Sequence, residues 1–201
     1  LGCGTGRGGL NLAVFGGLDV TFVDFAPNCL DADIVPMLEA QKHTLKFVEA
    51  DLSEPLPVEA EYGYCADVME HIRPHHVDRV LDNCLACAQH VFFQISTVDD
   101  GMGILLGHKL HLSVHDYKWW LNKFNERQCI IHWSKETDDT SMFYVTFRGT
   151  GRAMVDAGTV NTSNEQIKNN VAHNIKQGYI QVQPHPTNDI EVMIVGGGPS
   201  V

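Results

Sequence analysis

Short apolar runs alternate with helical patterns along the first three quarters of the chain, and this alternation constrains the fold more than any other feature. It is typical of a parallel sheet with helices on both faces. The expected strands are residues 20–24, 45–49, 62–66, 91–95, 129–133 and 142–147. The expected helices are residues 7–15, 27–41, 74–88 and 115–125. Only residues 134–141 separate the last two strands, so an antiparallel hairpin is expected at the sheet edge.

The composition and the charge narrow the range of partners. The 201 residues are 44% apolar and 19% charged, which suits one globular core with an appendage. The 25 acidic residues outnumber the 14 lysines and arginines, and a net charge of −11 is the wrong sign for nonspecific binding to phosphate backbones. No apolar run approaches the roughly 20 residues that span a bilayer, so no membrane partner is expected.

Six cysteines are scattered through the expected core elements, without the dense spacing of small secreted domains and without a secretory leader. We therefore expect reduced thiols in a cytoplasmic protein. Cys84 and Cys87 lie in a helical pattern with no second pair and no histidine at zinc spacing, so a shared helix face is favoured over a metal or redox site. No metal site is predicted.

The amino-acid composition of the chain changes after Arg148. Residues 1–148 are predicted to form the first domain, residues 149–188 a linker with a polar helix near 163–176, and residues 189–201 the first strand and glycine loop of a truncated second domain. A terminal strand that docks beside the first domain is the alternative for residues 189–201. The sequence opens inside another glycine loop, so the strand before Leu1 is expected to be missing. Without this central strand, the fragment is expected to be unstable or to bind ligands weakly.

That opening loop reads Leu-Gly-Cys-Gly-Thr-Gly, where a first strand would turn into a helix. Glycines allow positive φ angles and close approach of a ligand, and the helix start presents unpaired N–H groups. The spacing Gly4-x-Gly6-x-x-Gly9 also satisfies the dinucleotide fingerprint, so the loop alone does not discriminate between cofactors. Asp24 closes the second strand, where a carboxylate can accept hydrogen bonds from both hydroxyls of a ribose.

Two further motifs follow the next strands. Asp51 and Leu52 come just after the third element of the sheet, where a carboxylate can receive the exocyclic amine of an adenine. Residues 67–72, Asp-Val-Met-Glu-His-Ile, follow the next strand on the far side of the topological switch point. In order and spacing, these motifs over residues 1–148 resemble those of class I S-adenosylmethionine-dependent methyltransferases.

The resemblance implies a Rossmann-like α/β sheet, mostly parallel with an antiparallel C-terminal hairpin, and S-adenosylmethionine as cofactor. It places the glycines near the amino-acid end of the cofactor, Asp24 at its ribose, and Asp51 with Leu52 at its adenine. The implied cofactor-binding residues are Gly2, Cys3, Gly4, Thr5, Gly6, Asp24, Phe25, Asp51, Leu52, Asp67 and Val68.

The methyl acceptor is expected near residues 67–71 and 101–120, where such folds build their acceptor pocket. His71 is the best placed general base, and its alternative role is to order the loop under the cofactor. The predicted acceptor-lining residues are Glu70, His71, His108, His111 and Trp119. The segment from His111 to Trp120 also resembles phage-associated methyltransferases.

The function expected from these motifs is methyl transfer to a small-molecule or protein acceptor. A nicotinamide-dependent oxidoreductase shares the glycine loop and Asp24, but it does not require Asp51 together with the 67–71 motif, and an antiparallel final hairpin would count against it. A noncatalytic cofactor-binding scaffold is the other alternative. Residues 189–201 resemble the opening of 6-hydroxymethylpterin pyrophosphokinase-like domains and also flavin-binding openings, so a fused second domain is expected in the parent protein.

Overall fold

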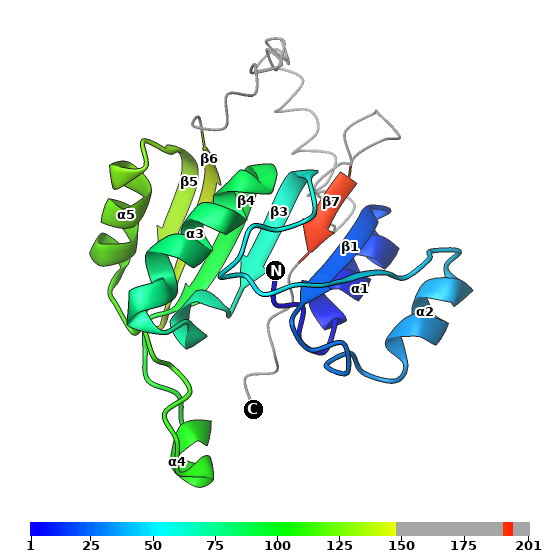
Figure 1. Ribbon diagram of the computed structural model, residues 1–201, viewed down its shortest axis with the longest axis horizontal. Helices are drawn as coiled ribbons and strands as arrows, with labels where there is room; N and C mark the ends of the chain where they lie inside the picture. The colour runs from blue at the N-terminus through cyan, green and yellow to red at the C-terminus, as the bar shows by residue number, and fades with distance from the viewer. Residues whose placement is uncertain (148–190, 195–201) are drawn as a thin grey trace, which may run out of the picture. The chain divides into compact units, whose positions relative to one another are not determined.

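The computed structural model describes residues 1–147 and 191–194, which form one sheet with helices against it (Figure 1). The strands are β1 (Asp19–Asp24), β2 (Lys46–Glu49), β3 (Ala60–Ala66), β4 (Ala88–Ser96), β5 (Ile130–Glu136), β6 (Thr140–Thr146) and β7 (Glu191–Ile194). The helices are α1 (Arg7–Gly16), α2 (Ile34–Ala40), α3 (Val77–Ala86), α4 (Met102–Leu106) and α5 (Tyr117–Glu126), with the short 3₁₀ turns η1 (Met69–His71) and η2 (Pro74–His76). None of these described helices is long and apolar enough to cross a membrane.

The sheet has the order β2-β1-β7-β3-β4-β6-β5. Neighbouring strands from β2 to β4 pair in parallel, whereas β6 runs antiparallel to both β4 and β5. This arrangement confirms the α/β class, the mostly parallel sheet and the C-terminal hairpin that the sequence predicts.

The centre of the sheet is occupied by β7, from the far end of the described chain. Its Met193 is in register with Thr21 of β1 and with Gly63 of β3. The expectation that this central position would be empty is therefore wrong, because β7 pairs with the two strand edges that would otherwise be open. The assignment of residues 189–201 to a second domain stays a prediction, and the predicted linker with its polar helix lies outside the described residues.

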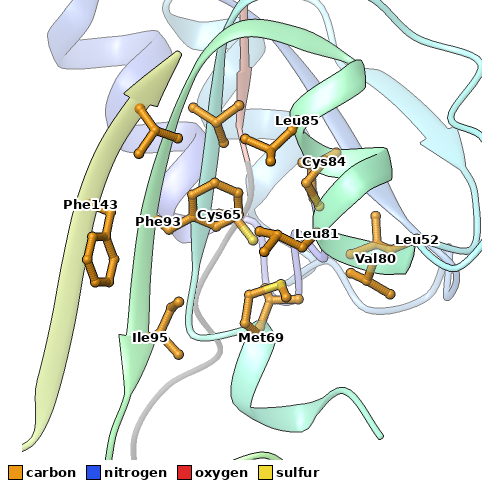
Figure 2. Packing of buried hydrophobic residues seen from close by; sticks show 14 of the residues in the cluster. Leu52, Cys65, Met69, Val80, Leu81, Cys84, Leu85, Phe93, Ile95 and Phe143 are labelled. Atoms are coloured by element: carbon orange, nitrogen blue, oxygen red, sulfur yellow. The ribbon is translucent and has the colours of Figure 1, made fainter. Parts of the chain in front are cut away.

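Two apolar clusters lie on opposite faces of the sheet. Alternate side chains of β1 point to opposite faces, so Val23 belongs to the cluster that includes α3 and α5, and Phe22 to the cluster that includes α1 and α2. Figure 2 shows the first cluster, in which Leu81 and Leu85 of α3 face Phe93 of β4. The helices thus hold the sheet from both sides and leave the carboxyl ends of β1, β3 and β4 free to carry a site.

Two helix predictions need correction. The helix expected at residues 27–41 begins only at Ile34, because the preceding segment forms turns in which the N–H of Cys29 donates to the carbonyl of Ala26 and the N–H of Asp31 to that of Thr5. Pro36 lies in the first turn of α2, where its missing N–H costs no hydrogen bond. The helix expected at residues 74–88 ends at Ala86, since β4 already begins at Ala88.

Candidate active site at the carboxyl ends of the strands

The glycine loop is bent back onto the end of β1. Gly2, Gly4 and Gly6 have φ angles of 78°, 44° and 80°, which side-chain-bearing residues rarely adopt. The backbone N–H groups of Gly2 and Cys3 both donate to the carbonyl oxygen of Val23, at 2.7 and 2.9 Å. The loop therefore ends beside β1 and leads into the N-terminus of α1, whose first N–H groups lack helical partners.

Asp24 fixes this loop and borders the space above it. Its side chain is 6% exposed, and its two carboxylate oxygens accept the backbone N–H groups of Gly4 at 2.9 Å and of Ala26 at 3.1 Å. Each carboxylate oxygen has a second lone pair, so Asp24 can still accept hydrogen bonds from a ligand.

A cavity of about 710 Å³ opens above the loop, within the size range of small-molecule sites. Eight of the predicted cofactor residues line it: Gly2, Gly4, Asp24, Phe25, Asp51, Leu52, Asp67 and Val68. The other three, Cys3, Thr5 and Gly6, are not among the lining residues. Cys3 instead packs into the core, with its Sγ 3.9 Å from the Sγ of Cys29.

The cavity is also lined by residues to which the sequence assigned no binding role. These are Ser53, Ile72, Arg73, His76 and Val80, and His71 completes the lining. Ser53 N–H donates to Asp51 at 2.7 Å, and this hydrogen bond lowers the pKa of the Asp51 carboxyl below its ordinary value. Phe25 lies at the rim with its ring 75% exposed. The cavity therefore combines three carboxylates, an exposed aromatic residue and a glycine backbone.

The turn after β3 is held in an uncommon conformation. Asp67 has a φ of 54°, in the left-handed region, and its N–H donates to the carbonyl oxygen of Gln94 at 2.9 Å. Its carboxylate accepts the side-chain amide of the same Gln94 at 3.2 and 3.3 Å. Gln94 on β4 thus fixes both the backbone and the side chain of Asp67 at the switch point.

A second cavity, of about 460 Å³, meets the first at this turn. Asp67 and His71 line both cavities. Glu70, Ser96 and His111 also line the second cavity. Two chambers therefore share one wall, which is formed by the residues directly after β3.

Glu70 is the most deeply buried carboxylate of this wall. Its side chain is 1% exposed, and Oε1 accepts the backbone N–H of Ser96 at 3.2 Å. No described residue donates a hydrogen bond to Oε2. Burial raises the pKa of the Glu70 carboxyl to about 7.

The two histidines of the second cavity face each other. The ring centroids of His71 and His111 are 4.9 Å apart and nearly perpendicular, at 83°. The Nδ1 atom of His71 lies 3.1 Å from the carbonyl oxygen of Leu110, and the Nδ1 of His111 lies 2.7 Å from that of Val98. Desolvation lowers the pKa of His71 below its ordinary value, which favours the neutral imidazole.

The structure brings Glu70, His71 and His111 together, but not the other two predicted acceptor residues. His108 does not line the second cavity, and lies instead in an adjoining one that shares Asp99 with it. Trp119 lines neither of the two joined cavities, and its ring stacks on His115 with centroids 3.7 Å apart.

No family model matches the sequence, and no curated protein matches it. Solved structures do resemble the fold. The PH0226 protein of Pyrococcus horikoshii OT3 matches over 73% of this chain and 80% of its own, with 11% identity and a TM-score of 0.56. The methyltransferase domain of bacterial CtHen1-CN matches over 73% and 87%, with 15% identity and a TM-score of 0.54.

A third structure, of LepI in complex with SAM, matches over 73% of this chain and 41% of its own, with 11% identity and a TM-score of 0.52. The chain therefore spans less than half the length of LepI. At these identities the likeness concerns the fold, which is the Rossmann-like α/β fold of methyltransferases.

Proposed function

We propose that this protein is an S-adenosylmethionine-dependent methyltransferase whose cofactor lies in the 710 Å³ cavity and whose acceptor enters the 460 Å³ cavity. The observation that carries the proposal is the shared wall at Asp67 and His71, because methyl transfer requires donor and acceptor to meet end to end. The methyltransferase domain of CtHen1-CN and the SAM complex of LepI, which share the fold, support it.

The residues of the first cavity fit this cofactor. The Asp24 carboxylate would accept the ribose hydroxyls, Asp51 would accept the adenine amine, and the exposed ring of Phe25 would stack at the rim. Gly2 and Gly4 present bare backbone to the amino-acid end. When bound, S-adenosylmethionine supplies a sulfonium methyl group that an acceptor attacks in line, which leaves S-adenosylhomocysteine.

The protein contributes alignment, exclusion of water and activation of the acceptor. His71 is the residue that we assign to activation, because it borders both cavities. A carbonyl oxygen can only accept a hydrogen bond, so the contact with Leu110 places the proton of the neutral ring on Nδ1. The lone pair is then on Nε2, where the imidazole can take a proton or bind a cation. A small molecule or a protein with an oxygen or nitrogen nucleophile is the proposed acceptor.

Calorimetric titration of the protein with S-adenosylhomocysteine tests the cofactor assignment, with NADH as the competing ligand. We expect binding of S-adenosylhomocysteine alone, and a loss of about 10- to 100-fold in affinity for Asp24→Ala, since a hydrogen bond to a charged group contributes about 1.5–3 kcal/mol. Asp24→Ala could lower the affinity by disturbing the glycine loop as well as by removing a ligand contact. Asp51→Ala changes an exposed side chain, so a loss of affinity in that variant reports the ligand contact alone.

Asp19→Ala is the matched control, because Asp19 lies at the opposite end of β1 and pairs with Lys46 on the surface. Its affinity should equal that of the unchanged protein. Preferential binding of NADH, or binding of neither ligand by a folded protein, would overturn the proposal. The antiparallel β6 already counts against the oxidoreductase alternative. Turnover of an acceptor would exclude a noncatalytic scaffold.

A further inference from the structure

We propose that Glu70, His71 and His111 form a binding site for a divalent transition-metal ion at the wall of the second cavity. The potential ligand atoms of these three side chains all lie within 4.8 Å of one another. Ligands about 2.0–2.1 Å from a tetrahedral zinc ion lie about 3.3 Å apart, so small side-chain rotations would close the set. Binding of the ion itself does not depend on the methyltransferase assignment.

The buried carboxylate of Glu70 points to a missing partner. The backbone of Ser96 holds Oε1, whereas no described residue donates to Oε2, although this atom is buried. A buried polar atom without a partner is costly and uncommon in folded proteins. A cation between Glu70 and the two rings would satisfy Oε2 and explain why a carboxylate is placed here with 1% exposure.

Both histidines are oriented as metal ligands commonly are. Each Nδ1 lies at hydrogen-bond distance from a backbone carbonyl, of Leu110 for His71 and of Val98 for His111. Because these carbonyls only accept, each neutral ring carries its proton on Nδ1 and its lone pair on Nε2. Donation of the second ring N–H to a carbonyl is the usual way in which proteins fix the tautomer of a metal-binding histidine.

The backbone ties the two ligand-bearing segments together. The carbonyl oxygen of Glu70 accepts the N–H groups of Leu112 and Ser113, at 2.7 and 2.9 Å. The Asp100 carboxylate accepts the N–H groups of Leu110 and His111, both at 3.1 Å. The position of His111 relative to Glu70 is therefore set by the fold, as a preorganised site requires.

The donor set selects the class of ion. Two imidazoles and one carboxylate suit zinc and other first-row transition ions, whereas magnesium and calcium prefer oxygen donors. The second group of potential ligands, Cys3, Asp24 and Cys29, differs because both oxygens of Asp24 have hydrogen-bond partners, so no buried oxygen of this group lacks a partner as Oε2 of Glu70 does.

Three protein ligands leave a coordination position open, as in catalytic zinc sites. In this protein the open position would face the second cavity. The role of the ion rests on the proposed function: it would bind the acceptor oxygen as a Lewis acid and promote the loss of its proton to solvent before methyl transfer. His71 would then be a ligand rather than the general base.

Metal titrations of the full chain test the site after treatment with a chelator and removal of the chelator. Calorimetry with Zn²⁺ should show one ion per chain, and Co²⁺ should give visible absorption bands of a coordinated ion. Mg²⁺ at the same concentrations should give no binding. Glu70→Gln and His111→Ala should each weaken Zn²⁺ binding by roughly tenfold or more.

His108→Ala is the matched control, because His108 lies on the same loop but neither lines the second cavity nor belongs to the group of potential ligands. It should bind Zn²⁺ like the unchanged protein, and thermal melts should verify that every variant is folded. Absence of stoichiometric binding, or unchanged binding in folded His111→Ala, would overturn the site and leave His71 as the general base.

S-adenosylhomocysteine titration of the same samples separates the two proposals. His111→Ala should retain S-adenosylhomocysteine binding, because His111 does not line the first cavity. Zinc binding without S-adenosylhomocysteine binding would overturn the proposed function and retain the metal site. S-adenosylhomocysteine binding without zinc binding would overturn the metal site and retain the proposed function.

Discussion

At the scale of single residues, close approach between backbone and side chain decides where glycine is required. Gly9 lies in α1, where alanine is normally favoured by about 1 kcal/mol. A Cβ atom on Gly9 would lie 2.2 Å from the ring of Phe22, which is fully buried in β1. The absence of a side chain at Gly9 therefore allows α1 to pack close to β1. The glycine loop leads into α1, and β1 ends at Asp24.

Gly9→Ala should destabilise the protein by about 1–3 kcal/mol, because overpacking against a rigid ring outweighs the gain in helix propensity. Chemical denaturation measures the free energy of unfolding. Gly101→Ala is the control, since nothing lies within 4 Å of its added methyl group, and its effect should stay within about 0.5 kcal/mol. A stabilised Gly9→Ala variant would show that α1 can move away from the sheet.

The cavity-lining residues at the ends of strands could be predicted better than the rest of the lining. Asp24, Asp51 and Asp67 each follow a strand, so the strand pattern alone brings them to one edge of the sheet. Arg73 lies directly before η2 and His76 within it, and no local pattern indicates that this short turn lines the cavity. The meeting of His111 with Glu70 depends on the Asp100 loop in the same way.

At the scale of elements, Arg127 and Lys123 attach α5 to α3. Lys123 donates to both carboxylate oxygens of Asp78. Arg127 follows α5 and donates to the carboxylates of Asp78 and Asp82 on α3, and also to the carbonyl oxygens of Asp78 and Lys123. Its side chain is only 12% exposed. Several charge-assisted hydrogen bonds in this sheltered position are stronger than an ordinary surface ion pair.

Arg127→Ala should lower the free energy of unfolding by about 1–3 kcal/mol, since it removes these hydrogen bonds and the packing of the side-chain stem. Lys46→Ala breaks the exposed pair with Asp19 and should cost less than about 1 kcal/mol. Thermal and chemical denaturation of both variants compare the two. Equal effects would mean that the partial burial of Arg127 adds nothing.

The periodic elements were predictable, and the short ones were not. Strand positions and the final hairpin followed from apolar runs, and α1, α3 and α5 from helical spacing. By contrast, η1 and α4 span 3 and 5 residues, which is too short for periodicity to show. The early part of the predicted second helix is a loop because the N–H of Asp31 donates to the distant carbonyl of Thr5 rather than to a carbonyl one turn earlier.

At the scale of the whole molecule, the sheet depends on a strand from the far end of the described chain. β7 pairs in parallel with β1 on one side and with β3 on the other. Local sequence predicts that residues 189–195 form a strand, but not which strands it joins. Pairing over such a separation is decided by which edges remain open, and no pattern within either segment specifies it.

Met193→Pro should therefore destabilise the entire sheet, since proline removes a ladder N–H from a central strand and fits only at edges or bulges. The expected cost is about 3 kcal/mol or more, seen as a lower midpoint for the whole unfolding transition. Ile130→Pro, at the start of the edge strand β5, is the control and should cost less. A variant with unchanged cooperative unfolding would show that the other strands close the sheet without β7.

The wall that the two cavities share makes their occupancies thermodynamically linked. Any ligand that shifts Asp67 or His71 from one side alters the shape that the other side presents. By linkage, the factor by which a molecule in the first cavity changes affinity in the second must equal the factor in the reverse direction. Gln94 holds Asp67 through both its backbone and its side chain. The rigidity of this contact therefore affects the coupling free energy between binding in the first cavity and binding in the second.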